Sequence, residues 1–207
     1  MTDWHAWHRD YDDRASSLAR RLLIVRRRVD ELVRSAPPVR RVLSLYAGDG
    51  RDVIPVLETL PPSGRPQLTL VELDAELAEE ARWRAIEADV AAEVVSGDAG
   101  LHATWRHVPP VDLLMLCGVF GNVSEADVRR TIRAVPALLT EAGTVLWTRG
   151  HVRGTDVRPQ IRAWFRAAGM EELAFDAEPI GYGVGVNRKT AGAPVGEVPD
   201  RLFSFVR

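Results

Sequence analysis

The chain has 207 residues, of which 46% are hydrophobic and 27% are charged, the balance of an ordinary soluble globular domain. Its net charge of −2 provides no basic field for a nucleic acid, and its single cysteine excludes an internal disulfide and a thiolate metal cluster. No apolar run reaches the ~20 residues of a membrane span, and the N-terminus lacks a secretion-signal pattern. We therefore expect a cytoplasmic protein without a membrane anchor.

Residues 1–36 predict a helical extension that precedes the main domain. After an aromatic and polar start, apolar residues recur three or four positions apart, as on one face of a helix. These residues are Leu18, Leu22, Val25, Val29 and Leu32. Asp12 or Asp13 would cap this helix and Pro37-Pro38 would end it. Arginines cover the other face, which predicts either a solvated surface or, as the alternative, a surface for RNA or an acidic partner.

Residues 37–207 alternate between strand and helix patterns and predict a single domain. Strands are expected at 40–45, 67–73, 92–96, 111–117, 144–148 and 171–176, with an antiparallel last strand at 201–207. Helices are expected at 51–60, 75–88, 125–141 and 155–168, with a short helix within 99–108. Pro136 should kink or divide its helix, Gly143 should end it, and 181–187 could be a flexible loop or a short strand. The pattern predicts an α/β fold: a doubly wound, mostly parallel seven-stranded sheet with helices on both faces.

The first strand of this domain ends at a glycine turn that predicts a ligand. Gly48 and Gly50 allow a ligand to approach the backbone at the start of a helix, where N–H groups are free. Glu72 ends the second strand 24 positions after Gly48, close to the ~20 positions at which an acid meets a ribose. The turn and the acid together predict a bound nucleoside.

The same turn argues against a dinucleotide. A dinucleotide fingerprint needs a third glycine three positions after Gly50, and that position is Val53. Arg51 and Asp52 suit a cofactor that ends in an amino acid, because an arginine can bind a carboxylate and an aspartate an ammonium. Capping of the following helix is the alternative role for Asp52.

These turns, within about residues 39–148, resemble those of class I S-adenosylmethionine-dependent methyltransferases. The family's acid-x-Gly-x-Gly-x-Gly loop aligns with Ser44, Tyr46, Gly48 and Gly50, so the acid and the first glycine are replaced. The resemblance implies S-adenosyl-L-methionine as cofactor. It also implies a set of cofactor-binding residues: Tyr46, Ala47, Gly48, Asp49, Gly50, Asp52, Glu72, Leu73, Asp98, Ala99 and Cys117.

The resemblance assigns roles within this set. Glu72 would bind both ribose hydroxyls, Leu73 would lie against the adenine, and Asp98 would accept its amino group with the Ala99 backbone alongside. The turn from Cys117 to Asn122 would separate the cofactor from the acceptor.

The acceptor side of the site would come from three segments: the aromatic N-terminus, Phe120 to Asn122, and Trp147 to His151. The candidate catalytic residues in these segments are His8, Tyr11, Asn122 and His151. Cys117 is expected to be a small buried residue rather than a nucleophile. No histidine pair has metal-binding i, i+4 spacing, so no metal is expected.

The expected activity is methyl transfer to an oxygen or nitrogen of a small molecule. Two alternatives stay open: an RNA methyltransferase that uses the arginine-rich helix, and a non-catalytic S-adenosylmethionine-binding partner protein. The expected partner is a small-molecule acceptor rather than a nucleic acid, and a homodimer also stays open.

Overall fold

The computed structural model describes residues 13, 16–151, 155–178 and 181–206. The strands are β1 (Arg41–Leu45), β2 (Gln67–Glu72), β3 (Ala92–Ser96), β4 (Val111–Leu116), β5 (Leu139–His151), β6 (Met170–Ala177) and β7 (Gly181–Lys189). The helices are α2 (Ser17–Val33), α3 (Ile54–Glu58), α4 (Ala75–Glu87), α5 (His102–Trp105), α6 (Glu125–Leu138) and α7 (Arg158–Ala167), with a 3₁₀ turn at Pro62–Gly64.

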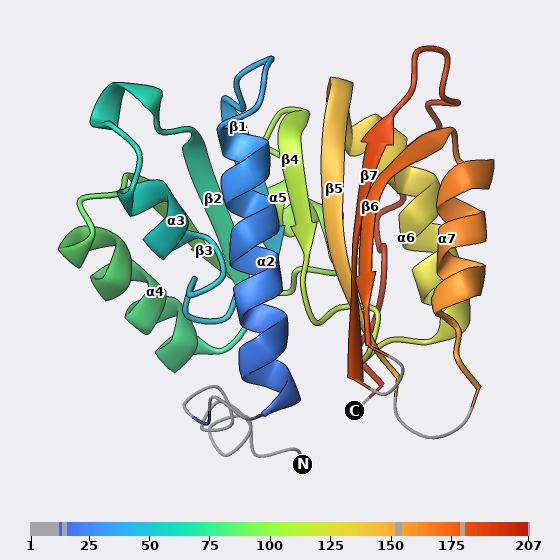
Figure 1. Ribbon diagram of the computed structural model, residues 1–207, viewed down its shortest axis with the longest axis horizontal. Coiled ribbons are helices and arrows are strands. Elements are labelled where there is room, and N and C mark those ends of the chain that lie inside the picture. The colour runs from blue at the N-terminus through green and yellow to red at the C-terminus, as the bar shows by residue number, and fades with distance from the viewer. Residues whose placement is uncertain (1–12, 14–15, 152–154, 179–180, 207) are drawn as a thin grey trace.

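The strands form one seven-stranded sheet in the order β3-β2-β1-β4-β5-β7-β6 (Figure 1). β1 to β5 pair in parallel, and β7 runs antiparallel to both β5 and β6. Six strands therefore share one direction, and the predicted doubly wound fold is confirmed. No described helix is long and apolar enough to cross a membrane.

Alternate strand residues feed two hydrophobic cores, one on each face of the sheet. Leu70 and Leu113 pack with Val25 of α2 and with residues of α3 and α4. Leu45 and Leu114 belong to the opposite core, with residues of α5, α6 and α7. Residues 113–116 of β4 are fully buried, which explains the unbroken apolar run in the sequence.

The N-terminal helix starts later than predicted. Ser16 is its N-cap, because the Ser16 hydroxyl accepts a hydrogen bond from the Ala19 N–H at 2.9 Å. The Asp13 carbonyl accepts the Ser16 N–H one turn before the helix, and Asp12 lies outside the described residues. The capping prediction was therefore wrong.

The arginines of α2 bind the sheet. Arg27 and Arg28 both contact Asp176 of β6 at 2.7 Å, and Arg20 contacts Glu178 at 3.1 Å. Arg21 is only 3% exposed, and its guanidinium lies 5.3 Å from the centre of the Tyr182 ring on β7. This face of the helix therefore serves to attach α2 to the β7–β6 side of the sheet.

Two element boundaries near Pro136 differ from the prediction. α6 ends at Leu138, so Pro136 sits in its last turn and does not divide it. β5 begins at once, because Leu139 pairs with Val111 and the Thr140 hydroxyl donates to Asp112 at 2.7 Å. The predicted helix end at 141 is therefore three residues too late, and the predicted strand start at 144 is five residues too late.

The antiparallel strand is β7 and not the C-terminal segment. The glycines of β7 made it look loop-like, but Gly185 is required for packing: a Cβ there would lie 2.2 Å from the Trp147 indole. The Trp147 Nε1 in turn donates to Asn187 of β7 at 2.8 Å. Residues 201–206 make only isolated pairs, Arg201 with Leu101 and Phe205 with Val123, so the predicted last strand at 201–207 was wrong.

Candidate active site

The parallel strands bring the predicted cofactor residues to one edge of the sheet, the lower edge in Figure 1. The turn after β1 has three residues at positive φ, Tyr46 (64°), Gly48 (57°) and Gly50 (72°). Position 50 favours glycine chiefly through its φ of 72°, which strains other residues, and a Cβ there would also displace the end of the Ile54 side chain, 2.5 Å away. The helix predicted from 51 starts at Ile54, so residues 51–53 belong to this turn.

Tyr46 fills part of the space where the family loop has glycine. Its ring lies 3.2 Å from where a Cβ on Gly118 would stand, and 4.7 Å, centre to centre, from the ring of Phe205. The Gly118 N–H donates to the Thr148 hydroxyl at 2.9 Å, which fixes the turn after β4 beneath this ring. Tyr46 therefore forms a wall between the turns after β1 and β4.

Glu72 binds the glycine turn to the end of β2. Its side chain is only 2% exposed, and its carboxylate accepts three backbone hydrogen bonds: from Gly48 at 2.7 Å and from Leu73 and Asp74 at 2.9 Å each. Burial raises the pKa of Glu72, although these three N–H groups act in the opposite direction. A carboxylate offers about four acceptor sites, so one remains for a ribose hydroxyl, rather than the two expected.

Asp49 has a structural side chain. It is 1% exposed and forms ion pairs with Arg51 at 2.8 Å and Arg84 at 2.7 Å. Burial raises its pKa, but the two arginines outweigh that effect, and the pKa is lowered overall. Only the backbone of Asp49 remains a candidate ligand contact, and Arg51 is turned away from its expected partner, a cofactor carboxylate.

Asp52 does not cap the next helix. The N-cap position of α3 is Val53, with no side-chain cap. The Asp52 Oδ1 atom is buried and has no hydrogen-bond partner among the described residues. Burial and, secondarily, the nearby Asp52 carboxylate raise the pKa of the Cys117 thiol, which keeps it protonated. The Asp52 carboxylate is therefore a buried acceptor beside the glycine turn, with the Cys117 thiol as a neighbour.

Two of the residues predicted to contact the adenine already form hydrogen bonds within the protein. The carboxylate of Asp98 accepts the Gly100 N–H at 2.8 Å and the Arg201 guanidinium at 2.9 Å. Ala99 is 3% exposed, and its carbonyl accepts the Trp105 indole N–H. Leu73, by contrast, is 62% exposed, as expected for a residue that lies against a ligand.

Arg201 belongs to a segment that we call the C-terminal strap, residues 200–206. Backbone hydrogen bonds join the strap to the turn after β3, at Gly100 and His102. The strap then reaches the first turn of α6, where the Ser204 N–H donates to Asp127 at 3.1 Å. It also reaches the turn after β4, where the Val206 N–H donates to the Asn122 carbonyl at 2.9 Å. The strap therefore crosses the edge that carries the predicted cofactor residues.

Two of the four predicted catalytic residues, Asn122 and His151, belong to the described part of the chain. The Asn122 amide donates to the Gly118 carbonyl at 2.7 Å and so closes its own turn. His151 ends β5, where it pairs with Gly181. His8 and Tyr11 lie outside the described residues. Within the described residues, no cluster of histidine, cysteine and acidic side chains could hold a metal.

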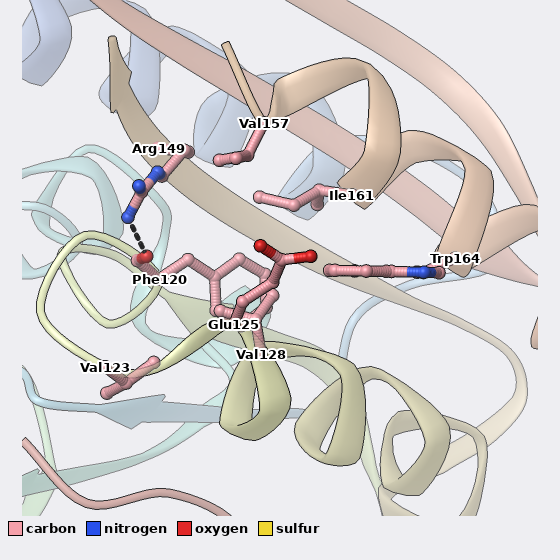
Figure 2. A pocket seen from close by; sticks show the side chains of 8 residues that line it. All are labelled: Phe120, Val123, Glu125, Val128, Arg149, Val157, Ile161 and Trp164. Carbon is pink, nitrogen blue, oxygen red and sulfur yellow. Dashed lines mark hydrogen bonds between the residues drawn. The ribbon is translucent and has the colours of Figure 1, made fainter. Parts of the chain in front are cut away.

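A pocket lies between the first turns of α6 and α7 (Figure 2). Phe120 and Arg149 come from segments predicted for the acceptor side, whereas the sequence did not indicate the walls from α6 and α7. The pocket is partly open to solvent and has mainly apolar walls. These walls are Phe120, Val123, Val128, Val157, Ile161 and Trp164. Glu125 and Arg149 are its charged residues, and an Arg149 N–H donates to the Phe120 carbonyl.

The fold and the edge described above define a class of protein. Solved structures that are similar over most of this chain include methyltransferases, and the chain has the Rossmann-like fold of class I methyltransferases. No protein-family model matches the sequence, and no curated protein matches it.

Three of these structures show the extent of the similarity. Magnesium protoporphyrin IX methyltransferase from Synechocystis PCC 6803, solved with bound SAM, has a TM-score of 0.68 at 13% identity, over 91% of this chain and 92% of that one. An O-methyltransferase family protein from Burkholderia thailandensis has a TM-score of 0.64 at 17% identity, over 89% of this chain and 62% of that one. An O-methyltransferase family 2 protein from Planctomyces limnophilus, solved with apigenin, has a TM-score of 0.63 at 16% identity, over 84% and 60%. This chain thus spans less than two thirds of the last two proteins.

Proposed function

We propose that the protein transfers the methyl group of S-adenosylmethionine to an oxygen or nitrogen of a small molecule. The observation that carries this proposal is the glycine turn, which Glu72 holds in place and beside which Asp52 leaves a buried oxygen without a donor. The fold supports the proposal, because similar structures include a methyltransferase solved with bound SAM and one solved with a small molecule.

The residues at this edge fit the parts of the cofactor. Glu72 has one acceptor site left for a ribose hydroxyl, and the Asp52 Oδ1 atom is suited to the ammonium group. The exposed Leu73 offers an apolar surface to the adenine. Asp98 can accept the adenine amino group if the Arg201 guanidinium gives way.

The chemistry asks little of the protein beyond positioning. The cofactor supplies a methyl group that its sulfonium already activates. The turns after β1 and β4 have to hold an acceptor atom in line at near-attack distance and keep water out. A general base is needed only for an acceptor that must lose a proton. Transfer therefore does not depend on a catalytic role for Asn122 or His151, each of which has its own backbone partner.

Calorimetric titration of the purified protein with S-adenosylmethionine tests the cofactor assignment. We expect saturable binding that Asp52→Asn weakens. Glu87→Gln, a change at the end of α4, is the matched control and should leave the affinity unchanged. The absence of binding heat at every temperature tried would contradict the proposal. Labelled cofactor added to a cell extract with the protein would then identify the methylated product.

The two alternatives make different predictions. An RNA methyltransferase requires available arginines on α2, but Arg20, Arg27 and Arg28 form ion pairs with β6 and the residue that follows it. Salt-sensitive retention on an RNA column would favour this reading. Tyr46 favours a non-catalytic binder, because its ring occupies space beside Gly118. Such a protein would bind the cofactor without forming any labelled product.

A further inference from the structure

The α6–α7 pocket is adjacent to the proposed cofactor site. Phe120 is one of its walls, and Gly118, which faces the Tyr46 ring, precedes Phe120 by two positions. Two residues of extended chain span at most about 7 Å. One short turn therefore separates the pocket from the place where the methyl donor would lie.

The walls of the pocket favour a flat apolar ligand. Phe120 is fully buried and held from behind by the rings of Trp147 and Phe165, at 6.1 and 6.2 Å. Trp164 provides a second aromatic surface, and Ile161 provides a buried aliphatic one (Figure 2). The pocket is partly open to solvent, so a ligand could extend beyond these walls. A single substituted aromatic ring suits this lining.

Glu125 supplies the charge that this ligand would meet. In Figure 2 its carboxylate points between the two helices, toward Ile161 and Trp164, whereas Arg149 is turned to the Phe120 carbonyl. Among the described residues, no side chain forms a hydrogen bond or ion pair with Glu125. A carboxylate only accepts hydrogen bonds, so it selects a ligand that has a donor group.

We propose that the α6–α7 pocket is the acceptor site, and that it takes a small aromatic molecule whose amine or hydroxyl group donates to Glu125. The role of this molecule as methyl acceptor rests on the proposed function. Its binding to the pocket can be measured whether or not the protein transfers a methyl group. Both an amine and a hydroxyl group can donate a hydrogen bond to the Glu125 carboxylate. Separate probes that carry one group or the other distinguish the two kinds of ligand.

The test uses three probes with one ring each: phenethylamine, phenol and phenylacetate. Binding to the full chain is followed by saturation-transfer NMR and titration, with and without S-adenosylhomocysteine. We expect phenethylamine and phenol to bind and phenylacetate not to bind. Glu125→Gln should weaken phenethylamine by about fivefold, the effect of losing one partly exposed ion pair, and should change phenol less.

Two further variants serve as controls. Val157→Phe, at a partly exposed pocket wall, should fill the space and abolish the binding of phenethylamine and phenol. Glu80→Gln, on an exposed face of α4, should change nothing. Thermal melting and S-adenosylmethionine affinity should be unchanged in all the variants.

Three outcomes would overturn the inference: phenylacetate binding as well as phenethylamine, probe binding that survives Val157→Phe, or no response to Glu125→Gln. A wild-type protein that binds the probes but not S-adenosylmethionine would instead contradict the proposed function and leave the aromatic site standing. The two failures are therefore distinguishable.

Discussion

Glu72 is the residue whose replacement tests the largest part of this structure. Three backbone N–H groups point at its carboxylate, from Gly48, Leu73 and Asp74. In Glu72→Gln, the amide oxygen can keep the two bonds from Leu73 and Asp74, but the NH₂ group then faces the Gly48 N–H. One buried donor is left unsatisfied, which costs about 1–3 kcal/mol.

Glu72→Ala removes all three acceptor contacts. We expect a loss of about 3–5 kcal/mol, less than three times the single cost because water enters the vacated space. For a chain of this length the melting temperature falls by about 2–4 °C per kcal/mol. Cofactor binding must therefore be measured at a temperature where the variant is folded, as shown by circular dichroism.

The pH dependence gives an independent check on Glu72. Its pKa is raised in the folded protein, chiefly by burial, so the folded state binds the proton more tightly than the unfolded state. The resulting stability is fully present below the unfolded pKa and is lost as the pH rises through the folded one. Urea unfolding of Glu72→Gln should lack this loss. A Glu72→Ala protein that melts like the wild type would refute the account of how the turn is held.

Three further predictions follow from the same edge and from α2. Asp52→Asn should weaken S-adenosylmethionine binding by about tenfold, the effect of losing a charge-assisted hydrogen bond, without lowering the melting temperature, and calorimetry checks both. Arg201→Ala should tighten binding by about threefold, because it releases Asp98 from one partly exposed ion pair; weaker binding would instead make Arg201 part of the adenine site. Asp176→Asn should lower the free energy of unfolding at pH 7 by about 1 kcal/mol. Burial raises the pKa of Asp176, but Arg28 outweighs it and the pKa is lowered overall, so this difference should disappear as the pH falls below 3.8 in urea titrations.

The sequence predicted correctly the strands and turns that are determined by residues close together in the chain. The unbroken apolar run of β4, the glycine turn after β1 and the acid that ends β2 lie where they were expected. These features depend on periodicity and backbone conformation, which neighbouring residues determine. The same holds for the sheet class, because short strands alternating with helices leave few other topologies.

Features that depend on distant residues stayed open or were missed. The glycines of β7 suited a loop as well as a short strand, because only the three-dimensional structure shows that Trp147 fills the space beside Gly185. The ion pair between Arg201 and Asp98 joins positions far apart in the chain, and no local sequence pattern predicts it. Arg21 did carry a signal: it lies three positions after Leu18 and four before Val25, on the apolar face of α2, where a buried arginine is rare.

The way the chain ends has a practical consequence. Val206 is hydrogen-bonded to Asn122 in the loop after β4, and Phe205 contacts Tyr46. Residues added directly after position 206 would begin beside the edge that carries the predicted cofactor residues, in competition with the strap. Side-by-side binding measurements on protein with and without such added residues would show how strongly the strap controls access to this edge.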